Sequence, residues 1–237
     1  MLADSVQTVD DILEIADRLS KKYGDWDHGN PKDPLLDLLY ILCSVRANGD
    51  KFAQSYRSLI DRFPDLGALA TAPVEEIAPA IVTAGLQNQK AATIQKVMNG
   101  IVAHFGEPTL SSLAEKSDQE CERFLTSLPG VGIKVARCVM LCGLGRLVFP
   151  VDTHCWRICC RLGWISPDRV GSRCTRKDMD FLQNRIPAEL RFSLHVNMIS
   201  LGREVCTART PRCNECLIRE YCHHARQIFV SGASLSQ

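Results

Sequence analysis

Residues 128–134 read LPGVGIK and join two stretches with helical periodicity. Pro129 and the glycines at 130 and 132 predict a tight turn, in which glycine lets the backbone approach another molecule closely. The helix expected from Ile133 begins with unpaired N–H groups and the positive end of its dipole, which suits a phosphate group. Taken alone, such a turn fits helix–helix packing better than ligand binding.

Helical periodicity continues on both sides of this turn, and no convincing strand alternation is present. Ser117 and Glu120 form a capping-box pattern that opens the preceding helix, and Asp152 or Thr153 can cap a later one. We therefore predict an all-α protein with short connections. The expected helices cover residues 12–19, 35–45, 52–63, 74–84, 90–105, 117–128, 133–144, 153–162, 177–186 and 189–206.

The composition is that of a globular protein with one large domain or two small ones: 237 residues, 46% hydrophobic and 23% charged. The net charge of +1 conceals two unlike halves. Residues 130–237 hold 16 Lys and Arg against 8 Asp and Glu, whereas residues 1–129 hold 12 against 19. This asymmetry indicates a side that faces a polyanion, although segregated solvated faces explain it equally well.

The N-terminal stretch lacks the features of a secretory signal, because it has neither a basic region nor an uninterrupted apolar one. No stretch approaches the length of a membrane span; the best candidate, PLLDLLYILCSV, carries Asp37 in its middle. We therefore expect an intracellular protein, in the cytoplasm or nucleoid (or in the nucleus of a eukaryote), without a membrane partner. In that compartment thiols stay reduced.

Four of the twelve cysteines stand close together near the C-terminus. Cys206, Cys213, Cys216 and Cys222 read C-x6-C-x2-C-x5-C in a polar segment that cannot form a core. Four thiolates at this density indicate a metal or cluster site, and the spacing leaves zinc and an iron–sulfur cluster open. The other eight cysteines lie mostly among apolar helix positions and are expected to pack as small hydrophobic residues.

Two further residues are candidates for chemistry, although neither is persuasive alone. Lys134 falls in the first turn of the helix after the glycine turn, where the dipole disfavours an ammonium and favours the neutral amine that Schiff-base chemistry requires. An isolated helical lysine is ordinarily a solvated surface charge. Asp152 begins another helix, so it is also an ordinary N-cap candidate.

Three motifs in this order resemble the endonuclease III group of the helix-hairpin-helix DNA glycosylases. They are LPGVGIKVA, FPVDTHCWRICCRLGW and the C-x6-C-x2-C-x5-C tail, and the similarity runs from about residue 34 to 226. The resemblance implies two α-helical lobes with DNA in the cleft between them. Residues 34–146 would form a six-helix barrel with the hairpin, and residues 1–33 with 147–237 a discontinuous second lobe. It also implies a [4Fe–4S] cluster on the four tail cysteines, in the segment 206–222.

The same resemblance implies a bifunctional glycosylase and AP lyase of base excision repair that acts on oxidised or otherwise altered pyrimidines in duplex DNA. Lys134 would be the nucleophile and Asp152 the catalytic carboxylate, because a flipped nucleotide exposes its C1′ to the amine. The lysine argues against the monofunctional relatives, which lack it. The residues expected at the DNA are Leu128, Gly130, Val131, Gly132, Arg46, Leu86 and His154.

The chain departs from the family pattern where the lesion is read. Arg46 stands at the family's glutamine, which fills the gap left by the flipped base, and Gly49 replaces an aspartate. Leu86 matches the leucine wedge, but Gln87 replaces the tyrosine beside it. An arginine can fill the gap and add phosphate or base contacts. These changes bear on substrate choice more than on reaction type.

Two other functions stay open from the sequence. The FPVDTHCWRICCRLGW segment also resembles the plant demethylating glycosylases, which makes 5-methylcytosine or mismatched thymine an alternative substrate. A non-catalytic damage-binding protein on the same scaffold is the second alternative, although a pure binder needs neither Lys134 nor Asp152. We expect a monomer with damaged or modified double-stranded DNA as its partner.

Overall fold

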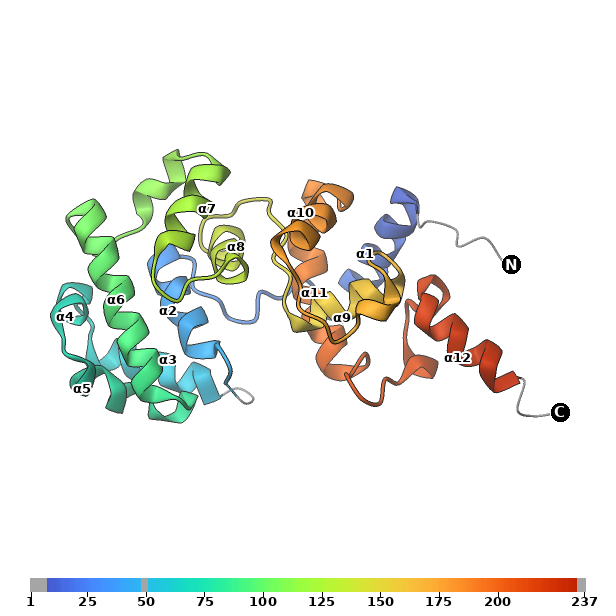
Figure 1. Cartoon of the computed structure of the whole chain (residues 1–237), viewed down its shortest axis with the longest axis horizontal. Coiled ribbons are helices and arrows are strands. Elements are labelled where there is room, and N and C mark those ends of the chain that lie inside the picture. The colour runs from blue at the N-terminus through green and yellow to red at the C-terminus, as the bar shows by residue number, and fades with distance from the viewer. Residues whose placement is uncertain (1–7, 48–50, 234–237) are drawn as a thin grey trace. The chain divides into compact units, whose positions relative to one another are not determined.

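The structure, a computed structural model, describes residues 8–47 and 51–233. Every regular element in these ranges is a helix, which confirms the predicted all-α class (Figure 1). The chain divides into two compact units. Of the described residues, those within 29–146 form the hairpin unit, and residues 8–28 with 147–233 form the terminal unit. The sequence analysis expects the hairpin unit to begin at residue 34 and to end at residue 146, so only its beginning differs, by five residues.

The hairpin unit is built around α2, whose apolar sequence PLLDLLYILCS is buried on nearly all sides. Asp33 caps this helix with its carboxylate, and Pro34 occupies the first turn, where its missing N–H costs nothing. Helices α3, α6 and α8 pack against α2. The helices of this unit are α2 (Pro34–Ser44), α3 (Lys51–Arg62), α4 (Leu66–Thr71), α5 (Val74–Ile77), η1 (Ala78–Ala84), α6 (Gln87–Phe105), η2 (Ser111–Glu115), α7 (Asp118–Ser127) and α8 (Ile133–Cys142).

Helices α7 and α8 form the hairpin around the glycine turn. The predicted capping box opens α7: Ser117 Oγ accepts from the Glu120 N–H, and the Glu120 carboxylate accepts from the Ser117 N–H. A buried ion pair joins the two helices, with Arg137 Nε 2.7 Å from Glu122 Oε2.

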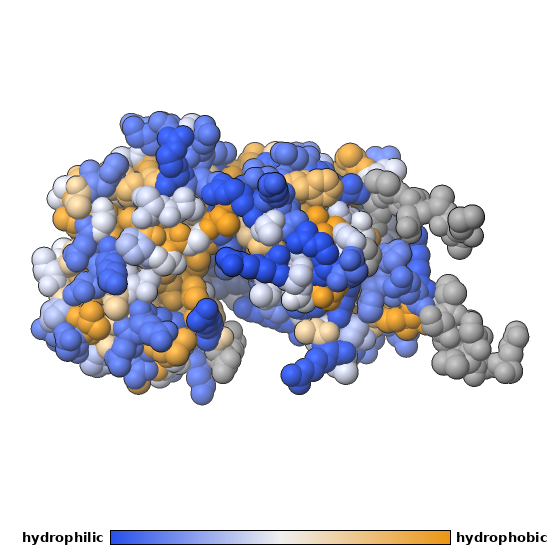
Figure 2. Space-filling model, in the orientation of Figure 1, coloured by the Kyte–Doolittle hydropathy of each residue, from blue (hydrophilic) through white to orange (hydrophobic). Residues whose placement is uncertain are grey.

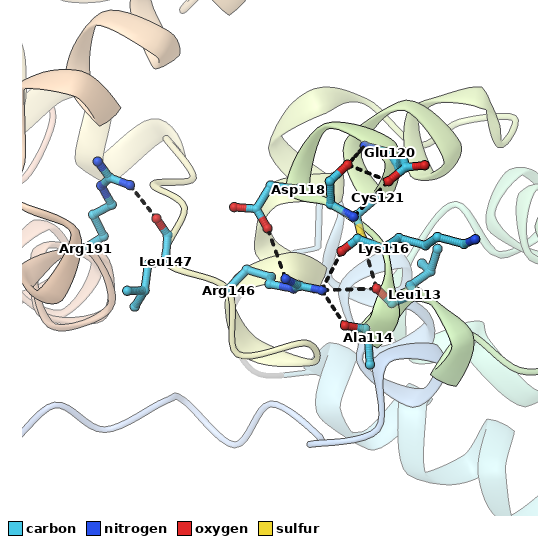
Figure 3. Close-up of polar contacts among 10 residues, drawn as sticks. Leu113, Ala114, Lys116, Asp118, Glu120, Cys121, Arg146, Leu147 and Arg191 are labelled. Atoms are coloured by element: carbon cyan, nitrogen blue, oxygen red, sulfur yellow. Dashed lines mark hydrogen bonds and ion pairs between the residues drawn. The ribbon is translucent and has the colours of Figure 1, made fainter.

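Arg146, which follows α8, ties the outer end of the hairpin together (Figure 3). Its Nη2 donates to the carbonyl oxygens of Ala114 and Lys116 at 2.7 and 2.8 Å, just ahead of α7. Its Nη1 lies 3.5 Å from a carboxylate oxygen of Asp118. The hairpin is therefore fixed at its outer end and along its length, so the glycine turn is presented from a rigid support.

In the terminal unit, α11 packs against both α1 and α9, and α12 packs against α9. Phe149, ahead of α9, is fully buried in this core. Arg191 holds the start of the second segment of this unit in place, because its guanidinium donates to the carbonyl oxygen of Leu147 (Figure 3). It also donates to the carbonyl oxygen of Gln183. The helices are α1 (Val9–Tyr23), α9 (Thr153–Leu162), η3 (Pro167–Arg169), α10 (Arg176–Arg185), η4 (Ala188–Leu190), α11 (Arg191–Glu204), η5 (Cys213–Glu215), η6 (Arg219–Tyr221) and α12 (His223–Ala233).

The structure differs from the predicted helices in three places. The single helix expected over 74–84 is the short α5 followed by the 3₁₀ helix η1. Pro79 explains this change, because it cannot donate an α-helical hydrogen bond. Helices α4 and α12 were not predicted.

On the face drawn in Figure 2, hydrophilic residues are interspersed with smaller apolar areas. None of the helices in the described part of the chain is both long and apolar enough to cross a membrane.

Candidate functional site

The hairpin turn uses its two glycines for different purposes. Gly130 has a φ of 81°, and a Cβ at this position would lie 2.7 Å from Thr93 Cγ2, so the fold itself requires glycine. Gly132 has ordinary extended backbone, and a Cβ there would meet no atom within 4 Å. The side chains of Leu128 and Val131 are buried and anchor the turn. We therefore expect this turn to contact a ligand through its backbone atoms, above all at Gly132, where no other atom occupies the adjacent space.

We expect Gly130→Ala to lower the free energy of unfolding by about 3 kcal/mol, because it adds a steric clash to an unfavourable backbone conformation. Gly145→Ala is the matched control: Gly145 has a φ of 63° but no neighbour within 4 Å. It should cost only about 1 kcal/mol. In urea unfolding followed by circular dichroism, Thr93→Ser in the Gly130→Ala background should recover part of the loss. Equal losses for both glycines would contradict the packing role.

Lys134 is the second residue of α8 and is half-buried. Gly132 is the N-cap, so this helix has no side-chain cap. Helices α1, α7, α9 and α10 are all capped by a side chain. The first turn of α8 thus keeps the positive end of its dipole and backbone donors that no capping side chain occupies, next to a lysine.

Asp152 is the N-cap of α9, as the sequence suggested. One of its oxygens, Oδ1, accepts from the N–H groups of His154 at 2.9 Å and Cys155 at 2.7 Å. The side chain is half-buried. Because both capping bonds end on Oδ1, they hold the carboxylate in a defined orientation.

His154 packs within the terminal unit. Arg157 Nη2 lies 3.1 Å from its Nδ1, and because a guanidinium only donates, Nδ1 is the acceptor. Burial lowers the pKa of His154, which favours the neutral ring. A Cβ at position 202 would lie 2.6 Å from this ring, so Gly202 makes room for it. The role of His154 at DNA stays a prediction.

Three of the predicted DNA-reading residues line one cavity in the hairpin unit. It has a volume of about 170 Å³. Arg46, Leu86 and Gly130 come from three separate segments of the chain to reach it. The cavity is lined by Leu42, Val45, Arg46, Leu86, Gln89, Lys90, Thr93 and Gly130.

Arg46 and Leu86 share an unusual backbone conformation. Each has a φ of 53°, in the left-handed region that costs a non-glycine residue about 1–2 kcal/mol. Both side chains are exposed. Gln87, which stands at the family's tyrosine, is the first residue of α6. Gly49 lies outside the described residues.

Lys90 is a cavity residue that the sequence analysis missed. Its side chain is buried, and its Nζ donates to the carbonyl oxygens of Cys43 at 2.7 Å and Ala84 at 2.8 Å. Burial lowers the pKa of its ammonium group. The available signal was its position in the apolar stripe of α6, four residues before the buried Ile94.

The four tail cysteines lie in a loop that begins at the end of α11. Short backbone hydrogen bonds shape it, among them those from the Cys216 N–H to the Cys213 carbonyl and from the Cys222 N–H to that of Arg219. Burial raises the pKa of Cys213 and Cys216, and that of Cys222 to about 11. Within residues 8–47 and 51–233, no three His, Cys, Asp or Glu side chains are placed as ligands of one metal ion.

Two arginines of α9 hold this loop. Arg161 is buried; its Nη1 donates to Cys206 Sγ at 3.1 Å and to the Thr207 carbonyl at 2.8 Å. Arg157 Nε donates to the Cys206 carbonyl at 2.8 Å. Four cysteine sulfurs in one loop, one of them hydrogen-bonded to a guanidinium, are the type of donor set that binds a metal cluster.

The family model for the "HhH-GPD superfamily base excision DNA repair protein" matches residues 40–182, which is more than half of the chain. The chain belongs to the HhH-GPD superfamily. A second model, the iron–sulfur binding domain of endonuclease III, matches residues 206–222 of this HhH-GPD protein. The tail is therefore a [4Fe–4S] cluster segment, which confirms the expected cofactor and decides between the zinc and iron–sulfur alternatives.

Relatives of the HhH-GPD chain fall into two groups. Endonuclease III of Thermotoga maritima is 28% identical over 216 residues, which cover 91% of the chain and 94% of that protein. Protein ROS1C of Oryza sativa is 32% identical over 181 residues, which cover 71% of the chain. The chain spans only about a tenth of that rice protein's length.

Solved structures share the fold of this HhH-GPD chain. A non-covalent endonuclease III–DNA complex superposes with a TM-score of 0.79 at 24% identity, covering 95% of the chain and all of the other protein. A thermostable thymine-DNA glycosylase has a TM-score of 0.76 at 16% identity and covers 92% of the chain and 98% of its own. These likenesses confirm the endonuclease III fold.

We expect Arg161→Gln to accelerate loss of the cluster roughly tenfold, because the variant removes the donor to Cys206 Sγ and leaves loop carbonyls without their partner. The decay of the broad visible iron–sulfur absorption in the presence of a chelator measures this rate. Arg226→Gln is the control, since Arg226 binds the Glu220 carbonyl from an exposed position and contacts no cysteine sulfur. Equal decay of wild type and Arg161→Gln would contradict the role of Arg161.

Proposed function

We propose that this chain is a bifunctional DNA glycosylase and AP lyase of base excision repair that removes altered pyrimidines from duplex DNA. The observation that carries the proposal is the position of Lys134, in the first turn of a helix without a side-chain cap and directly after the glycine turn. Backbone donors there suit a DNA phosphate. In this proposal, a strand whose phosphate binds there brings its sugar to the lysine.

Lys134 acts as the nucleophile in this proposal. The lone pair of its neutral amine attacks C1′ of a flipped nucleotide, and the glycosidic bond breaks with its electrons leaving on the base, which takes up a proton. The sugar ring opens to a Schiff base with Nζ. Loss of a C2′ proton then expels the 3′ oxygen by β-elimination, which cuts the strand.

Asp152 acts as the carboxylate that accepts the lysine's proton and stabilises the positive charge that develops on the sugar. Its two capping bonds support this role, because they fix the orientation of the carboxylate. Cys206, Cys213, Cys216 and Cys222 would hold the cluster, which would supply a cross-link in the loop that follows α11.

A second substrate class has specific support. Several relatives belong to the ROS1 and DEMETER group, including a protein named "DNA glycosylase/AP lyase ROS1" that is 30% identical over 189 residues. A thymine-DNA glycosylase shares the fold. A modified cytosine or a mismatched thymine is therefore the alternative substrate. Arg46, which stands at the family's glutamine, is the residue to substitute in order to test the choice between the two substrate classes.

The test is a cleavage screen on duplexes that each carry one defined change: an oxidised pyrimidine, uracil, a thymine mismatch, 5-methylcytosine or an abasic site. Borohydride is added to parallel reactions, because it reduces a Schiff base to a stable cross-link. We expect a covalent adduct on abasic DNA and strand cleavage at one class of altered pyrimidine. Binding without any adduct or cleavage would overturn the proposal in favour of a damage-binding protein.

A further inference from the structure

Lys90 is a buried cation whose ammonium pairs with carbonyl groups. The residue is 7% exposed, and within the described part of the chain Nζ contacts two backbone oxygens and no carboxylate. A buried cation without a carboxylate is costly, so the two carbonyl contacts are what retain it.

The two carbonyls belong to two different helix ends. Cys43 is in the last turn of α2, and Ala84 is the last residue of η1. Carbonyl groups at helix ends lack partners within their own helix and carry the negative end of the dipole. One ammonium group therefore caps two helices at once and fixes the distance between their ends.

The two cavity residues with left-handed backbone, Arg46 and Leu86, lie just beyond these ends. Arg46 follows Cys43 by three residues, and Leu86 follows Ala84 by two. The Leu86 carbonyl also accepts from the Lys90 N–H at 3.0 Å. Because an unfavourable φ persists only where the surroundings hold it, the Lys90 contacts are well placed to maintain both.

We propose that Lys90 is a positioning residue that holds Arg46 and Leu86 at the spacing needed to open a DNA duplex at the lesion. This inference rests on the proposed function. Without the ammonium, the ends of α2 and η1 lose their common partner, and the exposed side chains at 46 and 86 no longer enter the duplex together. Lys134 is on α8, outside the Lys90 contacts with Cys43 and Ala84, so reaction with a nucleotide that is already unpaired continues.

The first experiment compares borohydride trapping on two substrates: an abasic site in a duplex and an abasic site in an unpaired loop between duplex arms. Lys90→Met is nearly isosteric and removes only the donors. We expect its ratio of duplex to loop trapping rates to fall roughly tenfold or more relative to wild type, since small displacements of positioning groups have effects of this size. Lys96→Met, an exposed lysine on the same helix, should keep the wild-type ratio.

Lys90→Arg tests whether the donors matter, since a guanidinium can donate to both carbonyls and the adjacent cavity provides room. It should restore most of the ratio. If Lys90→Met does not accumulate as folded protein, Lys90→Gln, which can satisfy one carbonyl, should give an intermediate ratio. A wild-type ratio in Lys90→Met or Lys90→Gln, or an equal loss on both substrates, would overturn the inference.

A second measurement is independent of the lyase reaction. 2-Aminopurine opposite a tetrahydrofuran site becomes more fluorescent when it loses its stacking partners. Saturating wild-type protein should produce this rise and Lys90→Met should lose most of it; an equal rise with both overturns the inference. If the wild type were trapped on neither the duplex nor the loop substrate, the lyase proposal would be refuted instead.

Discussion

Lys134→Ala is expected to remain folded and to bind abasic DNA, yet to form no covalent adduct on borohydride reduction. Removal of the amine leaves C1′ without a nucleophile, so lyase activity should fall roughly 1,000-fold or more. Stability should change little, because alanine has the highest helix propensity and position 134 is inside α8. Gel analysis of trapped product and urea unfolding provide the two measurements.

Two controls separate the loss of a nucleophile from the loss of a charge. Lys134→Arg keeps the positive charge but is not a nucleophile at neutral pH, so it should bind DNA and fail to trap. Lys96→Ala removes an exposed lysine of the same unit and should trap normally. Full trapping by Lys134→Ala would assign the nucleophile to a different amine.

Asp152→Asn is expected to keep the fold and lose activity. Asparagine caps a helix as well as aspartate does, so the free energy of unfolding should change by less than about 0.5 kcal/mol. The side chain can still accept from the N–H groups of His154 and Cys155, but it no longer takes up a proton or stabilises positive charge. Base release should therefore fall roughly 100-fold, measured by single-turnover excision on the substrate found in the screen.

Asp33 offers a matched control for Asp152. It caps α2 with the same geometry, since one oxygen accepts from the N–H groups of Leu35 and Leu36, both at 2.9 Å. Asp33→Asn should affect neither stability nor excision. Asp152→Ala should lose about 1 kcal/mol of stability in addition to activity. If Asp152→Asn excises at the wild-type rate, the carboxylate is only a helix cap.

Features set by neighbouring residues in the chain could be predicted from the sequence. The capping box of Ser117 and Glu120 and the Asp152 cap depend on residues two or three positions away. The glycine turn could be placed in the same way. The break at Ala78 within the expected helix 74–84 is also local in origin, because Pro79 causes it. Helix α4 escaped prediction because its six residues are too few to establish a period.

Features that depend on tertiary packing could not be predicted. A left-handed φ at Arg46 or Leu86 has no local signature, since neither residue type prefers it. The burial of Lys90 depends on carbonyls 47 and 6 residues away in the sequence. Motif similarity suggested that Arg46, Leu86 and Gly130 share one site. Lys90, the residue that connects the segments of Arg46 and Leu86, was found only in the structure.

Helix α9 has the proposed catalytic carboxylate, Asp152, at one end and Arg161, which binds the cysteine loop, at the other. Its ten residues span about 15 Å, with Asp152 before the first turn and Arg161 in the last. Conditions that affect the sulfur ligands, such as low iron supply or oxidants, therefore also affect the packing of α9. The same helix orients Asp152 at its other end. We therefore expect the proposed excision activity to fall when the cluster is lost, because the loop that Arg161 contacts would then lack the group that cross-links it.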